Sequence, residues 1–302
     1  MKDFEYTDPQ SLREAVSLLS EKGNGARVLA GGTDLIVQMR VKRMQPERVV
    51  DVKNVPEVNE LSYGPRKGLT IGAAVPCHRI YNDPEVIARY PGLTDSASII
   101  GGIQIQGRAS IGGNLCNASP SADTIPTLIA YGATCEIAGL NGKRQVAVED
   151  FCTAPGQNVL EAGELLVALQ IPPVRKNTGA HYLRFIPRNE MDIAVVGAGA
   201  WVELGNRGTE FRAARIALAA VAPTPLYARD AGELLVGQKV SDEAIAAAAE
   251  AAKGVAKPIS DMRGAAEFRV HLVGVLTKRA LNGAVARAKG KFVANAVQKA
   301  AG

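Results

Sequence analysis

Two short glycine clusters are the parts of this chain whose residue types and spacing best suit ligand chemistry. The first, Ala30-Gly31-Gly32-Thr33-Asp34, joins a predicted short buried strand at residues 27–30 to a helical pattern at residues 35–41. A glycine-rich turn between a strand and a helix presents backbone N–H groups near a positive helix terminus, without Cβ atoms that would block an anion. That geometry suits a pyrophosphate. The turn has neither the Gly-x-Gly-x-x-Gly spacing nor a P-loop lysine, so an ordinary tight turn stays an open alternative.

The second cluster covers residues 108–123 and consists almost entirely of small and hydroxylated residues around Ser110-Ile111-Gly112-Gly113-Asn114. Such a segment offers backbone amides together with Ser and Asn side chains, on which a flat polar ligand can rest. Asp123 ends the cluster as a lone carboxylate. It can accept hydrogen bonds from ribose hydroxyls, or it can cap the helix predicted at residues 124–131. The residues alone leave these two roles open.

Composition indicates a folded protein of about two domains, because 302 residues that are 47% hydrophobic can bury a large core. The longest apolar runs, at residues 193–202 and 216–222, fall far short of the ~20 residues of a membrane span. The first six residues lack the basic start and apolar stretch of a secretory signal. We therefore expect no transmembrane segment and a cytoplasmic location.

Several functional classes are disfavoured by the cysteines, the charges and the histidines. At least 16 residues separate neighbouring cysteines, which argues against zinc or iron–sulfur spacing and predicts buried thiols and no metal site. The net charge is +5, but the basic residues are scattered and aromatics make up 5%, unlike a nucleic-acid binder. That charge suits an anionic cofactor or an acidic partner better. We expect His78, His181 and His271 to be structural or exposed, and we propose none as a catalyst.

The elements that must position the clusters alternate between helix and strand. A boundary is predicted at residues 172–179, where two prolines, a basic pair and a polar Asn-Thr-Gly stretch occur together. After it, we expect a small sheet covered by helices. Helical patterns occupy residues 11–22, 35–41, 78–90, 92–100, 124–131 and much of the chain from 241, and strand patterns occupy 27–30, 48–52, 68–73, 133–138, 165–171, 193–204 and 211–221.

Together the two clusters resemble the FAD-binding medium subunit of the molybdenum hydroxylases, the xanthine dehydrogenase and carbon monoxide dehydrogenase family. The resemblance rests on Ala-Gly-Gly-Thr-Asp-Leu at residues 30–35 and on Ser-Ile-Gly-Gly-Asn-Leu-x-Asn-Ala-Ser-Pro-x-x-Asp at residues 110–123. It continues through Gly-Glu-Leu-Leu at 163–166, Tyr-Leu-Arg at 182–184, Asp-Ile-Ala at 192–194 and Arg-Gly-Ala-Ala-Glu-Phe-Arg at 263–269. It thus covers nearly the whole chain.

This resemblance implies an α+β fold and a set of FAD-binding residues. The fold is a PCMH-type FAD-binding domain (residues 1–175, with subdomains of about 1–55 and 56–175), followed by a C-terminal domain (176–302) with a three-stranded antiparallel sheet and helices. The clusters would wrap the pyrophosphate, Asp123 would hold the adenosine ribose, Ile100 and Leu166 would line the cofactor, and Ile193 would lie beside the isoalloxazine ring. Arg184 stands where the family often has a lysine near the flavin. The implied cofactor residues are Val28, Leu29, Ala30, Gly31, Gly32, Thr33, Asp34, Leu35, Ile100, Ser110, Ile111, Gly112, Gly113, Asn114, Asp123, Leu166, Arg184 and Ile193.

The resemblance also implies partners and a role in electron transfer. A large subunit would carry molybdopterin, a small subunit would carry two [2Fe–2S] clusters, and the assembly would be a dimer of heterotrimers. Electrons from substrate oxidation would cross the clusters to FAD and pass to NAD⁺, a quinone or another acceptor, and this chain would need no catalytic side chain. A self-contained flavin-dependent oxidase is the alternative, although the sequence offers no convincing base for it.

Two differences from the carbon monoxide dehydrogenases of this family narrow the class of substrate that we expect. Carbon monoxide dehydrogenases of the family usually have Gly-Gly-His-Ser in the first turn and an aromatic residue in the later Asp-x-Ala motif. Here these are Gly-Gly-Thr-Asp and Asp-Ile-Ala. The sequence therefore favours a hydroxylase of an aldehyde, a purine or an N-heterocycle, or an aryl-CoA reductase. The cysteine-containing insertion that certain aryl-CoA reductases carry is not visible between Gly113 and Cys152.

Overall fold

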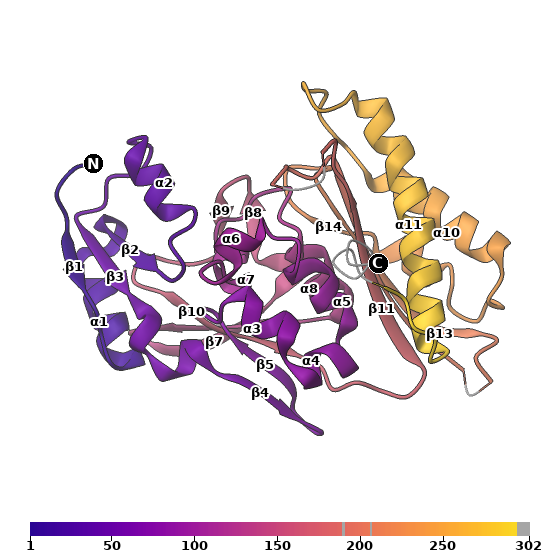
Figure 1. The fold of residues 1–302 in the computed structure, drawn as a ribbon, viewed down its shortest axis with the longest axis horizontal. Helices are drawn as coiled ribbons and strands as arrows, with labels where there is room; N and C mark the ends of the chain where they lie inside the picture. The colour runs from indigo at the N-terminus through magenta and orange to yellow at the C-terminus, as the bar shows by residue number, and fades with distance from the viewer. Residues whose placement is uncertain (189–190, 206, 295–302) are drawn as a thin grey trace.

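Three β-sheets of three or more strands, each with its own helices, and one two-stranded hairpin make up the described part of the chain (Figure 1). The computed structural model describes residues 1–188, 191–205 and 207–294. The first sheet is formed near the N-terminus, the second is central, and the third carries the long C-terminal helix (Figure 1). The mixture of helix and strand confirms the expected α+β class. The last eight residues of the expected C-terminal domain lie outside the described residues.

The first sheet is parallel, with the strand order β1-β3-β2. Parallel neighbours need crossover connections, which α1 and α2 supply. Ser11 begins α1, because its side chain accepts a hydrogen bond from the Glu14 amide, and Gly23 ends it at a φ of 47°. The apolar face of α1 packs on the sheet through Ala15, Val16 and Leu19. The elements are β1 (Glu5–Thr7), α1 (Leu12–Lys22), β2 (Ala26–Leu29), α2 (Leu35–Arg40) and β3 (Arg48–Asp51).

The second sheet is antiparallel, with the order β4-β5-β10-β6-β7. Its central strand β10 is buried on both faces. Leu166, Leu169 and Ile171 pack against the helices on one face, while Leu165 and Val167 pack toward α1 on the other. The strands are β4 (Leu61–Gly64), β5 (Gly68–Gly72), β6 (Thr134–Gly139), β7 (Gly142–Ala147) and β10 (Leu165–Ile171), and the hairpin β8 (Cys152–Ala154) with β9 (Gln157–Asn158) lies beside them.

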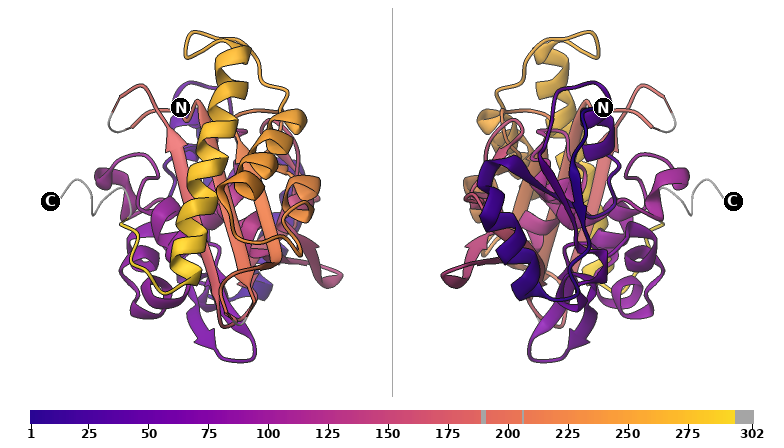
Figure 2. Two further views of the ribbon diagram at one scale, coloured as in Figure 1. Left: turned by 90° about the vertical axis from the view of Figure 1, so that its right-hand side faces the viewer. Right: turned by 90° about the vertical axis from the view of Figure 1, so that its left-hand side faces the viewer.

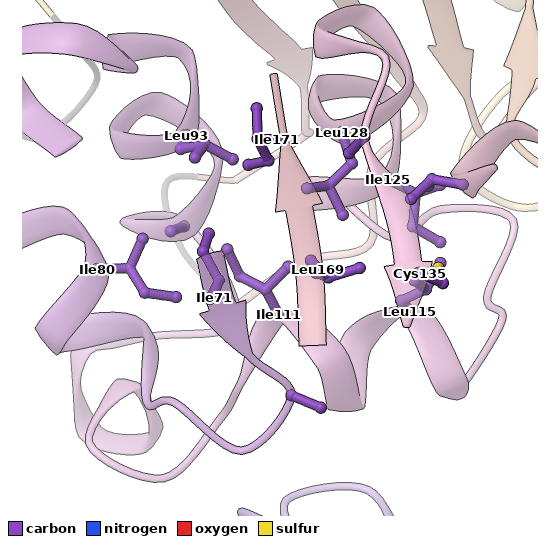
Figure 3. Packing of buried hydrophobic residues seen from close by; sticks show 14 of the residues in the cluster. Ile71, Ile80, Leu93, Ile111, Leu115, Ile125, Leu128, Cys135, Leu169 and Ile171 are labelled. Carbon is purple, nitrogen blue, oxygen red and sulfur yellow. The ribbon is translucent and has the colours of Figure 1, made fainter. Parts of the chain in front are cut away.

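Short helices cover one face of the second sheet and enclose its core (Figure 3). The single helix expected at residues 78–90 is two helices, because Pro84 lacks the N–H that a continuous helix needs. The Asp83 carboxylate caps the second of them by accepting from the Glu85 and Val86 amides. These helices are α3 (Cys77–Asn82), α4 (Pro84–Arg89), α5 (Pro91–Ala97), α6 (Ile103–Gln106), α7 (Ile111–Cys116) and α8 (Thr124–Tyr131). Single 3₁₀ turns occupy Gly23–Gly25, Val52–Asn54, Pro56–Asn59 and Val148–Asp150.

The third sheet is antiparallel, with the order β11-β12-β13-β14. Its three long strands are those expected from the resemblance, and β14 adds only two residues at the edge. Helices α10 and α11 lie across one face (Figure 2), whereas α5 and α8 pack against the other. No helix of the described chain, not even the 23-residue α11, is long and apolar enough to cross a membrane. The elements are β11 (Thr178–Phe185), β12 (Val196–Leu204), β13 (Phe211–Ala219), β14 (Leu226–Tyr227), α9 (Arg229–Glu233), α10 (Asp242–Val255) and α11 (Ala266–Ala288).

Each sheet with the helices that pack on it is called a unit below. A buried ionic cluster joins the second and third units. The side chain of Asp95 on α5 is only 2% exposed. It accepts from the Arg287 guanidinium at 2.6 and 2.9 Å, from His181 Nδ1 at 2.8 Å and from the Tyr182 amide at 3.1 Å. Burial would raise the pKa of Asp95, but the hydrogen bonds from His181 and Arg287 outweigh burial and lower it. The cluster therefore fixes β11 and α11 against the helices of the second unit.

Candidate cofactor-binding site

A cavity of about 570 Å³ lies between the first and second units, and both glycine clusters line it. Its walls come from the β2–α2 turn, from the start of α7 and from residues 156–166 before and within β10. A volume of this size falls in the range of small-molecule and cofactor pockets, roughly 300–1,000 Å³. The structure thus brings together two motifs that are about 80 residues apart in the sequence.

The first cluster is a tight turn whose backbone packs directly on the second cluster. A Cβ atom on Gly31 would lie 1.9 Å from the carbonyl oxygen of Arg108, so only glycine allows this approach. The Arg108 Nε donates to the Gly31 carbonyl at 3.4 Å, which reinforces the contact. Gly32 has a φ of 77°, in the left-handed region that favours glycine. The turn is therefore built by close backbone contact as well as by its own conformation.

The second cluster forms a short helix, α7. Ser110 caps α7, because its Oγ accepts from the Gly113 amide at 3.0 Å. A Cβ atom on Gly112 would lie 2.4 Å from the carbonyl oxygen of Ala73, so this glycine lets α7 pack closely on the segment that follows β5. Gly113 differs, because a Cβ atom there would meet only the Ser110 Oγ within 4 Å. Gly113 thus keeps one wall of the cavity flat.

Unpaired backbone donors line the cavity at both clusters. Within the described residues, the N–H groups of the cavity-lining residues Thr33, Asp34 and Gly112 find no acceptor. Such orphan donors occur at the first turns of helices and readily bind anions. Two sets of free N–H groups beside glycines without Cβ atoms fit a pyrophosphate, and the adjoining cavity has room for groups attached to it.

Most of the residues singled out from the sequence line this cavity, but some lie elsewhere. Leu29 and Ile111 face the core, and Figure 3 shows Ile111 among the buried side chains around β5 and β10. Asp123, Arg184 and Ile193 are not part of the cavity wall, and Ile193 is 49% exposed. The predicted residues that do line the cavity are Val28, Ala30, Gly31, Gly32, Thr33, Asp34, Leu35, Ile100, Ser110, Gly112, Gly113, Asn114 and Leu166.

Asp123 belongs to a second buried network, with two residues of β11. It stands at the start of α8 but makes no capping hydrogen bond, so the structure does not realise the helix-cap role. Its carboxylate accepts from the Tyr182 hydroxyl at 2.8 Å and from the Arg184 guanidinium at 2.6 Å. Burial and the neighbouring Asp123 carboxylate raise the pKa of Tyr182 well above its usual value, so its hydroxyl stays protonated. Both oxygens of Asp123 therefore have partners within the chain.

Sequence reasoning missed the polar residues that tie the cavity walls together. The Asn158 Nδ2 donates to the Cys116 carbonyl at 2.8 Å and so holds the β8–β9 hairpin against the end of α7. The Gln38 Nε2 donates to the Asn117 Oδ1 at 3.3 Å and connects α2 to the same point. The signal for the hairpin was Pro-Gly at residues 155–156, a turn sequence between two short strands. Its position at the cavity depends on contacts that span more than 40 residues.

The cysteines are thiols with little tendency to ionise. Burial raises the pKa of Cys77 and of Cys116 to about 12 and that of Cys152 to about 11, and it also raises the pKa of Cys135. A thiolate is the form that binds metals or attacks electrophiles, so these side chains behave as small apolar groups. In the described chain no group of three or more His, Cys, Asp or Glu residues is arranged to hold a metal ion.

Comparison with known proteins matches each half of the chain to a protein family. Residues 2–174 match the family described as the FAD binding domain in molybdopterin dehydrogenase. Residues 181–284 match the C-terminal domain of the CO dehydrogenase flavoprotein. The first match alone covers more than half of the chain.

Relatives and solved structures agree with this assignment. The chain is 35% identical to the carbon monoxide dehydrogenase medium chain of Hydrogenophaga pseudoflava, covering 94% of this chain and 98% of that one. It is 33% identical to the putative xanthine dehydrogenase FAD-binding subunit of Escherichia coli strain K12, covering 97% and 100%.

Its structure matches carbon monoxide dehydrogenase from Hydrogenophaga pseudoflava with a TM-score of 0.90, at 34% identity, covering 95% and 98% of the two chains. It also matches quinoline 2-oxidoreductase from Pseudomonas putida 86 with a TM-score of 0.87, at 32% identity, covering 95% and 99%. These findings confirm the expected family, and the chain belongs to the FAD-binding medium subunits of the molybdenum hydroxylases, a family of oxidoreductases.

Proposed function

We propose that this chain is the electron-transfer subunit of a multi-subunit molybdenum-dependent hydroxylase or dehydrogenase. It receives electrons from the [2Fe–2S] clusters of a small partner subunit and passes them to an external acceptor such as NAD⁺ or a quinone. The observation that carries this proposal is the cavity in which both glycine clusters present free backbone N–H groups.

The residues proposed to hold FAD have distinct tasks. The free amides of both clusters bind the pyrophosphate, and Gly113 leaves room for it. Ile100 and Leu166, which are 8% and 2% exposed, give the cavity an apolar wall that excludes water. We propose that Asp123, Arg184 and Ile193 form the part of the site that lies toward β11, beyond the wall of this cavity. A bound flavin supplies the redox chemistry, while the protein binds it and controls access to it.

The alternative, a self-contained flavin-dependent oxidase, lacks support at the cavity. Such an enzyme needs a base that can take a proton from its substrate. None of the three histidines lines the cavity, and His181 is buried in its hydrogen bond to Asp95. Three carboxylates line it, those of Asp34, Glu161 and Glu164. Hydrogen bonds from Arg144 lower the pKa of Glu164 and keep it paired. Burial raises the pKa of Asp34, but this residue belongs to the glycine turn proposed to hold the pyrophosphate. The geometry therefore favours a relay subunit.

The proposed assembly is a dimer of heterotrimers in the cytoplasm, with molybdopterin on a large subunit. We further propose a domain boundary between residues 175 and 176, in the exposed segment between β10 and β11. Sequence identity does not choose the organic substrate, because the carbon monoxide dehydrogenase and xanthine dehydrogenase relatives differ by two percentage points. The Gly-Gly-Thr-Asp turn and the Asp-Ile-Ala motif remain our reason to propose a substrate other than carbon monoxide.

Anaerobic rapid mixing tests this function. The purified complex is mixed with an organic substrate that it oxidises, and the flavin and iron–sulfur absorbance bands are followed separately. The relay role predicts that both bands bleach in the complex, and that the isolated FAD-loaded chain does not react with the same substrate. Oxidation of that substrate by the isolated chain would instead establish the self-contained oxidase.

A further inference from the structure

The side-chain amide of Asn114 lies at the wall of the cofactor cavity, and only its oxygen is engaged within the chain. The Oδ1 atom accepts from the Thr124 hydroxyl at 2.6 Å, while the backbone N–H of Asn114 donates to the Ser110 carbonyl at 2.9 Å. The Nδ2 atom has no acceptor in the part of the chain that the structure describes, and it is not among the fully enclosed polar atoms there. Asn114 therefore offers accessible N–H donors at the cavity wall.

Asn158, which lines the same cavity, has its amide engaged at both ends. Its Nδ2 donates to the Cys116 carbonyl at 2.8 Å, and its Oδ1 accepts from the Leu160 amide at 3.0 Å. Such an amide holds the wall together and has its main hydrogen-bonding capacity filled. The amide of Asn114 differs, because its nitrogen end is left for a ligand.

Thr124 determines which end of the Asn114 amide turns to the cavity. It is the first residue of α8, it is completely buried, and it is not part of the cavity wall. A separation of 2.6 Å between the two side chains is typical of an O–H···O hydrogen bond, whereas N–H···O bonds are most often about 2.9–3.0 Å long. The amide oxygen thus points to a buried hydroxyl inside the protein. Because the amide is planar, its nitrogen lies on the other side, toward the cavity.

Contacts with the third unit hold Thr124 in place. The carboxylate of the preceding residue, Asp123, accepts from the Tyr182 hydroxyl at 2.8 Å and from the Arg184 guanidinium at 2.6 Å. Both donors lie on β11. The start of α8 is therefore fixed against the third sheet, and the Thr124 hydroxyl stays directed at the Asn114 oxygen.

We propose that Thr124 is a positioning residue for cofactor binding, which orients the Asn114 amide so that its Nδ2 donates to the pyrophosphate. This inference rests on the proposed function, because it needs the pyrophosphate at the free N–H groups of the two clusters. Gly112, two residues before Asn114, carries one of these free groups. A hydrogen bond to an anionic acceptor is stronger than one between neutral groups. In the reversed orientation, the amide oxygen would face the phosphate oxygens and repel them.

Titration of the apoprotein with FAD tests this role, with flavin fluorescence as the signal and circular dichroism to confirm folding. Thr124→Val removes the hydroxyl and keeps the shape of the side chain, whereas Thr124→Ser keeps the hydroxyl. The matched control is Thr127→Val on the same helix, because the Thr127 hydroxyl is buried and has no partner within the described residues. Asn114→Asp replaces the amide nitrogen by an oxygen. Asn114→Ala, alone and combined with Thr124→Val, completes a double-mutant cycle.

We expect Thr124→Val to raise the dissociation constant for FAD about tenfold, the effect of one lost hydrogen bond to a charged group. Thr124→Ser and Thr127→Val should bind FAD like the wild type. Asn114→Asp should bind at least as weakly as Thr124→Val, because a carboxylate would face the phosphates. With alanine at position 114, Thr124→Val should change the dissociation constant less than about twofold, since no amide is left to orient.

Three results would overturn the inference: wild-type affinity in Thr124→Val, an equal loss in Thr124→Ser and Thr124→Val, or the same effect of Thr124→Val with and without the Asn114 amide. Wild-type affinity in Asn114→Asp would overturn it as well, and this half-buried position tests the orientation of the amide even if Thr124→Val does not fold. A folded wild-type chain that binds no FAD would overturn the proposed function itself, a result distinct from these.

Discussion

Removing Arg287 should destabilise the fold strongly, because it would leave the Asp95 carboxylate buried without its main partner. The two side chains are 8% and 2% exposed and share two hydrogen bonds. Breaking a buried ion pair by removing one partner costs about 3–5 kcal/mol. Arg287→Met should therefore lower the free energy of unfolding by about 3–5 kcal/mol. Urea denaturation at pH 7, followed by circular dichroism, measures this loss.

Two controls separate burial from the mere presence of an ion pair. Arg89→Met removes a cation from the exposed pair with Glu85, whose side chains are 44% and 50% exposed, and should cost less than about 1 kcal/mol. The double variant Asp95→Leu/Arg287→Met should lose less than the sum of its single changes, because no buried charge is left alone. The reasoning is refuted if Arg287→Met costs no more than Arg89→Met.

The stabilisation that the Asp95 carboxylate contributes should depend on pH in a definite direction. The folded-state pKa of Asp95 is lowered, so the stabilisation from its carboxylate is complete above the unfolded-state pKa of about 3.9 and is lost as the pH falls through the folded-state value. The difference in stability between wild type and Arg287→Met should accordingly shrink in acid, below about pH 4.

Three further predictions concern the cavity wall, the domain boundary and the thiols. Gly112→Ala should lower the thermal midpoint even without FAD, because its Cβ would meet the Ala73 backbone; an unchanged midpoint would show that this contact relaxes freely. Trypsin should first cut after Arg175 or Lys176 in the exposed segment between β10 and β11, and the two fragments should co-elute on gel filtration; separate elution would contradict the buried cluster as a clamp. Cys152, with a pKa raised to about 11, should react with a disulfide reagent at pH 8 roughly 200-fold more slowly than a free cysteine. Labelling of Cys152 at the free rate would show that its thiol is not held in an apolar site.

Local chemistry explains which parts of the fold the sequence predicted well. Helix α8 and strand β10 have the bounds predicted from their apolar patterns. Ser11 begins α1 as its hydroxyl side chain suggested. The break at Pro84 was overlooked, although its cause is local, because a helical pattern continued on both sides of it. Short strands such as β4 and β7 have weak patterns, since they lie at the edges of the sheet and carry exposed positions.

The candidate site was predictable as two motifs but not as an arrangement. The motifs indicated where an anion might bind, yet the reasons for their glycines differ. Gly31 and Gly112 allow backbone contacts with distant segments, whereas Gly113 faces the cavity, and only three-dimensional packing distinguishes them. The partners of Asp123 lie about 60 residues away on β11, a strand that sequence reasoning did not delimit. Long-range contacts of this kind leave no local signal in the sequence.

The central claim, that the cavity between the glycine clusters holds FAD, is tested most directly by FAD titration of one pair of variants. Gly113→Val places side-chain carbons in the cavity, whereas Gly254→Val adds the same side chain at an exposed position on α10 with no atom within 4 Å of the new Cβ. The apoprotein of each variant is titrated with FAD, and bound flavin is measured by fluorescence quenching, with circular dichroism to confirm folding. We predict near-stoichiometric binding by wild type and Gly254→Val, and no binding by folded Gly113→Val at concentrations that saturate the wild type. Wild-type affinity in Gly113→Val would show that the cofactor binds elsewhere.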